Sequence, residues 1–525
     1  MTLEALMREA AAAFGAGDAV RAEPIFRQIV AINPRDAEAW HALALITCSS
    51  GRASEAFDCA LRAQKLEPRN HVFLNTVGVS CVESGREEEA LRWFRRALKE
   101  KPADAHTHYN LAKAFGKLRQ YEAAEKAYSS ALRIDPSMAD AANNLAHVYL
   151  RAGRYDDAQR MLERAGILLP DDETVAINSA AVLHATRGAG AAIGYLEAFL
   201  GRNPDAARVH YELSMRLLAD GRLAEGWREY AWRYRVPGSE PPPGLVNALR
   251  ENLSGQTVLV TPVQGLGDQL FFLRFVPVLR SRGARVIFAC PDKMLAMLAG
   301  AADLDRLIGW DSAELQELSD VLLASVADLP RLLESNAAPA PFRIMVPAAR
   351  TAAWRERLAA LGPPPYLGLT WRAGTGRQVT SEFAPAGLVA LYKEIDIAAL
   401  AHAVRRWPGT LLALQRQPES GEIAALSRAA ERKLHDLTSL NERLDDMAAV
   451  LALIEEYVGV SNTNMHIRAA VGKAARVLVP YPAEYRWMHS GQTSPWFPGF
   501  RVYRQPALLD WTQALRELAV DLASR

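Results

Sequence analysis

A proline recurs every 34 residues from Pro34 to Pro204, and this period constrains the fold of the first part of the chain. Small side chains recur in phase with the prolines. They stand at Ala10, Ala44, Gly78, Ala112, Ala146 and Ala180, and again at Ala22, Ala56, Ala90, Ala124, Ala158 and Ala192. Because proline ends a helix and small residues let two helices pack closely, the period predicts a stack of helical hairpins.

The 34-residue period is that of tetratricopeptide repeats, in which each unit is a pair of helices. Turn glycines at Gly51, Gly85 and Gly153 separate the two helices of a pair. We therefore predict an all-α superhelix over residues 1–236, with about seven repeats.

The seventh unit, Ala207 to about Arg235, departs from this pattern and ends in the aromatic run WREYAWRY. Two interpretations are open. The aromatic side chains either dock the last repeat on the next domain or cap the end of the stack by themselves.

Asparagine also recurs at the 34-residue period on the first helix, at Asn110, Asn144 and Asn178. The concave face of such a stack commonly binds extended peptide, and side-chain amides can bond both the N–H and the C=O of a peptide backbone. One interpretation is therefore an acceptor-binding ladder. The other is that asparagine is simply common at this position in repeats of this kind.

The proline-rich stretch Pro237–Gly244 predicts a stiff linker, which we place at residues 237–255.

Strand-like runs then alternate with helical stretches, at Thr257–Thr261, Gln269–Ser281, Arg285–Ala289 and Lys293–Ala299. A second joint, at Gly362–Pro365, precedes more of the same alternation. Strands are expected at Tyr366–Trp371, Thr410–Gln415, Tyr457–Ser461 and Ala475–Pro480, and helices at Asp396–Arg406 and Leu444–Glu456. Alternation of this kind predicts two Rossmann-like domains, each a parallel sheet covered by helices.

A glycine loop follows the first of these strands and contains Gln264, Gly265, Gly267 and Asp268. Strand, glycine loop and helix form the first unit of a Rossmann-like sheet. Glycines let the backbone approach a ligand, and the start of the helix offers free N–H groups. The loop lacks the full dinucleotide fingerprint, so the pattern alone also fits a turn with only a structural role.

Composition excludes several classes of function. The formal net charge of +1 gives the chain as a whole no electrostatic basis for binding nucleic acid or an anionic membrane. The four cysteines form no CxxC pair, which argues against a zinc site or a disulfide scaffold. The chain begins without a signal-like segment and has no apolar run of the roughly 18 residues that a membrane span needs. We expect a cytoplasmic protein.

The segment from about Thr257 to Gln505 resembles a GT-B glycosyltransferase of the heptosyltransferase-like superfamily, as found in bacterial tetratricopeptide proteins. The stretches that match are GLGDQLFFLRFVPVLRSRGARV, YLGLTWRAG, VGVSNTNMHIRAAVGKAARVLVPYP, YRWM and SPWFPGFRVYRQ. The sequence SNTNMH followed by EYRWM is especially similar to alphaproteobacterial glycosyltransferases that modify flagellin. The plan of repeats followed by GT-B also resembles the eukaryotic O-GlcNAc transferase, at the level of architecture.

This resemblance makes Asp268 the candidate base for the acceptor hydroxyl, although an aspartate here could equally cap the following helix. It also implies that donor phosphate binds at the turn after a C-terminal strand, where the family has a D-T-x-x-x-H motif. Here Ser461 stands in place of the aspartate and Asn462 in place of the threonine. The predicted donor and phosphate contacts are Gln264, Gly265, Gly267, Asn462, Thr463, Asn464 and His466, with Arg468 one turn further on. The other interpretation of His466 is a buried helix histidine.

Arg372, just after a strand, is the candidate cation for the leaving nucleotide, and Arg377 is a second one. Gln415, at a strand end, is a candidate for contacting the nucleobase or for a packing role. No metal is expected, since Asp445 and Asp446 sit within a helical pattern typical of a solvated face. Trp487 and Trp496 are expected in the core, and the alternative is a stacking platform.

We therefore predict a protein O-glycosyltransferase without a cofactor, whose repeats hold the acceptor. The predicted domains are residues 1–236 for the repeats, 256–350 for the N-terminal GT-B half and 351–525 for the half that binds the nucleotide-sugar. The resemblance implies transfer to Ser or Thr of flagellin, from a donor such as a CMP-linked nonulosonic acid. The alternatives are a lipopolysaccharide or other glycan as acceptor, and a non-catalytic scaffold with a degenerate GT-B domain.

Overall fold

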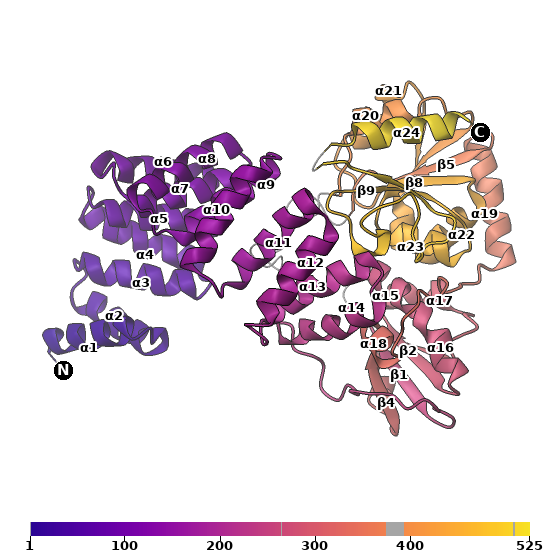
Figure 1. Ribbon diagram of the computed structural model, residues 1–525, viewed down its shortest axis with the longest axis horizontal. Helices are drawn as coiled ribbons and strands as arrows, with labels where there is room; N and C mark the ends of the chain where they lie inside the picture. Colours follow the sequence, from indigo (N-terminus) through magenta and orange to yellow (C-terminus); the bar gives the residue numbers. More distant parts are fainter. Residues whose placement is uncertain (1, 264, 374–392, 508–509, 525) are drawn as a thin grey trace. The chain divides into compact units, whose positions relative to one another are not determined.

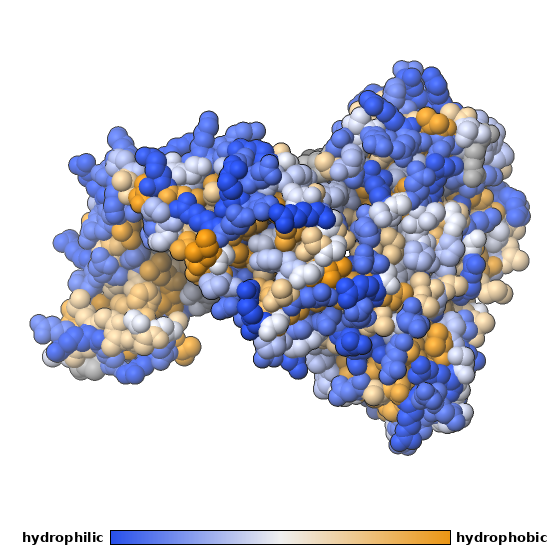
Figure 2. Space-filling view, viewed as in Figure 1, coloured by the Kyte–Doolittle hydropathy of each residue, from blue (hydrophilic) through white to orange (hydrophobic). Residues whose placement is uncertain are grey.

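The computed structural model describes residues 2–263, 265–373, 393–507 and 510–524. It forms two compact units, Met1–Thr186 and Arg187–Arg525, and each is described by itself (Figure 1). Hydrophilic side chains cover much of the face seen in Figure 2, with apolar areas between them. Over the described parts of the chain, none of the helices is long and apolar enough to cross a membrane.

The first unit is a stack of helical hairpins, which confirms the predicted all-α repeat superhelix. Its helices are α1 (Leu3–Gly15), α2 (Ala19–Ile32), α3 (Ala37–Ser49), α4 (Ala53–Leu66), α5 (His71–Glu83), α6 (Glu87–Glu100), α7 (Ala105–Lys117), α8 (Tyr121–Ile134), α9 (Ala139–Arg151), α10 (Tyr155–Leu168) and α11 (Glu173–Arg187). Small residues sit where the helices cross. A Cβ added at Gly78 of α5 would lie only 2.5 Å from the Phe94 ring of α6, so this crossing requires glycine.

The second unit begins with α12 (Ala189–Leu200), α13 (Ala207–Asp220), α14 (Leu223–Tyr230) and the 3-10 helix η1 (Ala231–Arg235). Two sheets follow, and all strand pairs recorded in them are parallel. This confirms the prediction of parallel sheets with helices, while the assignment to GT-B and the predicted domain boundaries stay predictions.

The first sheet has the order β3-β2-β1-β4 in the described residues. Its strands are β1 (Thr257–Thr261), β2 (Arg285–Cys290), β3 (Arg306–Gly309) and β4 (Val321–Ser325). The helical segments among and after them are α15 (Leu266–Phe272), η2 (Leu273–Phe275), α16 (Val276–Ser281), α17 (Asp292–Leu298), η3 (Ala313–Leu315), η4 (Val326–Asp328) and α18 (Leu329–Leu332). The single helix expected over Gln269–Ser281 is wrong, because Pro277 has no N–H to bond the carbonyl of Leu273 and the helix breaks there.

The second sheet has the order β10-β9-β8-β5-β6-β7 among the residues described. Its strands are β5 (Tyr366–Leu369), β6 (Thr410–Ala413), β7 (Leu434–Asp436), β8 (Glu456–Val460), β9 (Arg476–Val479) and β10 (Arg501–Arg504). Helices cover both faces (Figure 1), and each face has its own apolar core. The helices are α19 (Ala348–Leu361), α20 (Ile397–Val404), α21 (Glu422–Ala429), η5 (Thr438–Glu442), α22 (Leu444–Leu453), α23 (Thr463–Ala470), η6 (Tyr485–Trp487) and α24 (Thr512–Ala523).

Asp445 and Asp446 at the start of α22 are not on a solvated face, and that expectation is wrong. Asp446 is 7% exposed and accepts hydrogen bonds from the Trp354 indole and the Arg350 guanidinium, both at 2.8 Å. Asp445 also pairs with Arg350. The two carboxylates therefore tie α22 to α19.

The aromatic run at the end of the repeats joins the last hairpin to the sheets. Trp227 of α14 is 1% exposed, and its ring lies 5.9 Å from that of Phe272 and 6.0 Å from that of Trp496. Trp232 instead stacks on His210 of α13 at 3.8 Å. The run therefore both docks the hairpin and caps it, and α12–α14 belong to the same compact unit as the sheets.

We predict that Trp227→Ala destabilises the second unit by about 3–5 kcal/mol, because the large buried ring leaves a cavity between hairpin and sheet. Hydrogen exchange followed by mass spectrometry should show lost protection in α14, α15 and β1, with α3–α6 unchanged. The matched control is Trp310→Ala, since Trp310 is 45% exposed. An equally small effect of both substitutions would contradict the docking role of Trp227.

Candidate functional site

The two loops singled out in the sequence meet in the structure. Strand β1 leads into α15 and strand β8 leads into α23, and the first turns of these helices touch. A Cβ added at Gly267 would lie 2.9 Å from Cδ2 of His466 and 3.4 Å from Cα of Thr463. A residue with a side chain at position 267 would therefore push the two helices apart.

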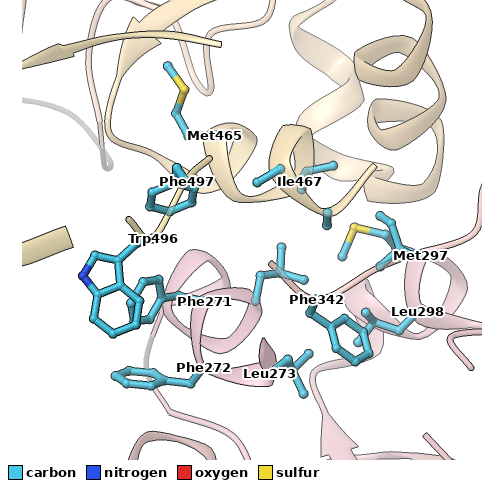
Figure 3. Close-up of a cluster of buried hydrophobic side chains, with 14 of the residues drawn as sticks. Phe271, Phe272, Leu273, Met297, Leu298, Phe342, Met465, Ile467, Trp496 and Phe497 are labelled. Atoms are coloured by element: carbon cyan, nitrogen blue, oxygen red, sulfur yellow. The ribbon is translucent and has the colours of Figure 1, made fainter. Parts of the chain in front are cut away.

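An apolar cluster holds α15 against α23. Figure 3 shows Phe271 and Leu273 on the α15 side, Met465 and Ile467 on α23, and Phe497 between the two helices. These five residues are at most 1% exposed. Trp487 and Trp496 are both 0% exposed, which confirms their predicted core role.

Asp268, the predicted base, forms an ion pair with Arg486 of η6. It is the third residue of α15, and Gly265 is the N-cap, so the interpretation of Asp268 as the capping residue is wrong. Its Oδ2 lies against Gly265, and a Cβ added at Gly265 would come within 2.6 Å of that oxygen. Gly265 also has a φ of +84°. The side chain of Asp268 is 39% exposed, whereas that of Arg486 is 13% exposed.

A second ion pair lies beside the first, between Lys393 and Glu484. Ser461 donates to the same Glu484 carboxylate at 3.0 Å. Where the resemblance leads one to expect an aspartate, the structure thus places a serine bonded to a glutamate from another segment. Burial, with repulsion from Arg486, lowers the pKa of Lys393 to about 8, although Asp268 opposes that shift.

His466 is buried beneath these charges. Burial and the positive charges of Arg486, Arg274 and Lys393 hold its pKa well below the ordinary value, so the imidazole is neutral at pH 7. Its Nδ1 has no hydrogen-bond partner among the described atoms. His466 thus lies beside the first turn of α15, and its predicted contact with phosphate stays a prediction.

Asn462 and Asn464 use their amides inside the protein. Asn462 is the N-cap of α23 and accepts from the backbone N–H of Met465, while its Nδ2 donates to Thr370 at 2.9 Å. Asn464 is 4% exposed and donates to the carbonyl of Leu414 at 3.2 Å. Thr463 is half-buried at the first position of α23. Among the predicted phosphate contacts in this turn, Thr463 thus has a side chain that remains accessible and is not committed to capping the helix.

Arg468 does not contribute to an anion site, and that expectation is wrong. Its guanidinium is 1% exposed and donates to the carbonyls of Leu451, Ile454, Glu455 and Ala474. Because these acceptors lie at the end of α22 and in the loop after α23, Arg468 fixes the backbone around β8. Burial lowers its pKa to about 10.

Arg372 and Gln415 are hydrogen-bonded to each other. Among the described residues, the bonds that they form do not include Asp268 or Arg486. Arg372 is 5% exposed and pairs with Glu422 at 3.0 Å and with the carbonyl of Gln417 at 2.7 Å. Gln415 accepts from the backbone N–H groups of Trp371 and Arg372 at 3.0 and 3.1 Å. Its Nε2 donates to the carbonyl of Arg416 at 2.9 Å. Gln415 therefore uses its amide inside the protein, and its predicted contact with a nucleobase stays a prediction. Arg372 already has an anionic partner.

Two residues suggested by the sequence, Gln264 and Arg377, lie outside the described residues. Sequence reasoning in turn gave no role to Lys393, Glu484 and Arg486, although EYRWM was among the stretches that matched. Among the described residues, no group of three or more His, Cys, Asp or Glu side chains could hold a metal ion.

The recurring asparagines connect neighbouring repeats. Asn110 donates to Asn75, Asn144 to the Tyr109 hydroxyl and Asn178 to Asn143, each bond spanning 35 residues. His41 and Thr76 pair across the same interval. Asn178 is 1% exposed, so it is not presented on an open face, while Asn110 and Asn144 are half-buried.

Comparison with known proteins gives matches for the repeats. Residues 49–105 and 117–177 match the family described as tetratricopeptide repeat. These stretches are tetratricopeptide repeats. The chain is also 24% identical over 347 residues to protein FlbA of Caulobacter vibrioides, a match that covers 61% of this chain and 56% of FlbA. The chain thus spans little more than half of that relative.

Solved structures of tetratricopeptide repeat proteins are also similar to part of the chain. A tetratricopeptide repeat protein from Parabacteroides merdae is 18% identical with a TM-score of 0.38, covering 45% of this chain and 94% of its own. The tetratricopeptide protein TTC0263 from Thermus thermophilus is 22% identical with a TM-score of 0.32, covering 35% and 99%.

We predict that Asn178→Ala lowers the free energy of unfolding of the repeats by about 1–3 kcal/mol, because it leaves the buried Oδ1 of Asn143 without its donor. Urea unfolding of residues 1–186 measures this change. The double variant Asn143→Ala/Asn178→Ala should cost less than the sum of the two single changes, since it removes both partners. Strict additivity would show that the bond between these two side chains contributes nothing.

Proposed function

We propose that this chain is a protein O-glycosyltransferase, with the repeats holding a protein acceptor and the second unit transferring a sugar from a nucleotide-sugar. The observation that carries the proposal is the contact of Gly267, the residue before Asp268, with the first turn of α23 at the carboxyl ends of β1 and β8. In parallel sheets, ligands bind beyond the carboxyl ends of the strands. The resemblance of residues 257–505 to GT-B enzymes supports the same conclusion.

In the proposed reaction the hydroxyl oxygen of a Ser or Thr attacks the anomeric carbon of the sugar. The bond from that carbon to the donor phosphate breaks, and Asp268 takes the hydroxyl proton. The departing nucleotide carries negative charge, and fixed cations stabilise it without a metal. Arg486 and Lys393 are better candidates for this role than Arg372, because Arg486 pairs with Asp268 and Lys393 pairs with Glu484 beside it, whereas Arg372 pairs with Glu422.

The acceptor and donor follow from the resemblance. Repeats of this type commonly bind protein partners, and the resemblance to enzymes that modify flagellin makes flagellin the first acceptor to test. With flagellin as acceptor, a CMP-linked nonulosonic acid is the corresponding donor. We propose that the protein acts in the cytoplasm, where nucleotide-sugars are available.

Two alternatives remain. The enzyme could glycosylate a lipopolysaccharide or other glycan, in which case the repeats bind no protein acceptor. The chain could also be a non-catalytic scaffold. The specific observations in favour of a scaffold are Ser461 in place of the family aspartate and the commitment of Gln415 to backbone N–H groups.

Intact mass of flagellin, co-expressed with this chain in cells that make the donor, tests the proposal. We expect a sugar-sized increase with the wild type, and a rate of modification about 10²–10⁴-fold lower with Asp268→Asn, because an amide cannot accept the proton. Asp311→Asn, at an exposed position of the same half, is the matched control and should modify normally.

The outcomes separate the alternatives. Modification by wild type and Asp268→Asn at equal rates would keep the transferase and reject Asp268 as base. No modification by the wild type, with donor supply verified, would reject flagellin as acceptor. Binding of a glycan but of no protein by the repeats would then favour the glycan enzyme.

A further inference from the structure

The side chain of Arg486 is much more deeply buried than that of the carboxylate that neutralises it. The exposed fractions are 13% for Arg486 and 39% for Asp268. The guanidinium of Arg486 also lies over the Phe271 ring at 4.6 Å and the Tyr485 ring at 5.0 Å. Because a buried charge without a partner is costly, Arg486 must keep an anion, whereas Asp268 can move into water.

Two neighbours of Arg486 show that it lies among groups that offer it no negative charge. Lys393 and His466 both lie close enough to Arg486 for its charge to lower their pKa values. Glu484 is the second carboxylate near Arg486, at 4.0 Å, but it is already paired with Lys393 and bonded to Ser461. Asp268 is therefore the carboxylate that an incoming anion can replace at the lowest cost.

The same ion pair restricts Asp268 as a base. Its Oδ1 is bonded to Arg486, and its Oδ2 lies against the backbone of Gly265. While Oδ1 is bonded to Arg486, this oxygen is occupied and is not available to an acceptor hydroxyl.

We propose that Arg486 binds an oxyanion of the donor, a phosphate or a sugar carboxylate, and that this exchange releases Asp268 to act on the acceptor. This inference rests on the proposed function and adds to it an order of events: the donor binds first and thereby frees the base. In the donor-free protein, Asp268 occupies the place of the donor anion. The contact prevents the site from holding an unpaired buried charge while it is empty.

The exchange makes a prediction about anion binding that needs no acceptor and no transfer. Isothermal titration of the full chain with inorganic pyrophosphate, and separately with N-acetylneuraminate, distinguishes a phosphate from a sugar carboxylate as the ligand. We expect one of these probes to bind the wild type. Asp268→Asn should bind it about 10-fold more tightly because the competing carboxylate is gone, and Arg486→Gln at least about 30-fold more weakly.

The double variant Asp268→Asn/Arg486→Gln decides between exchange and a simple charge effect. If the anion takes the place of Asp268 on Arg486, the tightening caused by Asp268→Asn disappears when Arg486 is also replaced. If Asp268→Asn tightens binding equally in both backgrounds, the ligand does not contact Arg486 and the inference is overturned. Absence of binding of both probes to the wild type would also overturn it.

Two further variants control for folding and for general charge. Arg486→Lys keeps a cation and should retain weakened binding, whereas Arg306→Gln removes an arginine that is 51% exposed and pairs with Glu314. Arg306→Gln should leave binding unchanged. Because these titrations use no flagellin, they can fail while flagellin is modified, or succeed while it is not, so failure of the inference is separable from failure of the proposed function.

Discussion

The need of one buried arginine for an anionic partner connects the parts of the second unit. Arg486 lies on a short segment, residues 484–490, that touches each part in turn. Tyr485 packs against Trp227 of the last hairpin at 5.9 Å, Arg486 pairs with Asp268 of α15, and Trp487 stacks on Phe497 at 4.5 Å. His489 then contacts the carbonyl of Ala219 at the end of α13. The segment that carries Arg486 therefore contacts the last hairpin, α15 and the loop that contains Phe497.

Buried and half-buried arginines also fix the backbone around the site. Arg274 donates to the carbonyl of Trp496 at 2.7 Å and Arg504 to that of Met488 at 2.9 Å, while Arg468 bonds carbonyls around β8. Each of these guanidiniums satisfies several backbone acceptors in loops that have no ladder of their own. Burial lowers the pKa of Arg274 to about 9 and that of Arg504 to about 10. The loops that carry Arg486 and the Trp496 ring are thus held by side chains from distant segments.

The sequence predicts the parts of the fold that local pattern determines. The range expected for the first strand, Thr257–Thr261, coincides with β1 because a buried strand is a short apolar run between turn residues. The run expected over Tyr366–Trp371 is too long, since β5 ends at Leu369. The backbone N–H of Trp371 donates to the side chain of Gln415 instead of to a neighbouring strand. No local sequence pattern predicts this bond.

The candidate site is predictable only in part, because local pattern identifies its loops but not the contacts between distant segments. Glycine and polar residues after a strand identify the loops of Asp268 and His466, and the structure brings these loops together. Arg486 lies 218 residues from Asp268, and Lys393 lies in a different segment from Glu484, so neither ion pair leaves a spacing that the sequence could reveal. The periodic asparagines are visible in the sequence, but whether they face a peptide or the next repeat depends on how the repeats stack.

Photocrosslinking tests most directly whether the junction of α15 and α23 holds a nucleotide. Photoreactive analogues of CMP, UDP and GDP would be irradiated with the full chain, and the labelled peptides identified by mass spectrometry. The account predicts that at least one analogue labels peptides within residues 257–281 and 456–489, and that the unmodified nucleotide competes. Labelling confined to residues 1–186, or no specific labelling by any of the three, would contradict it.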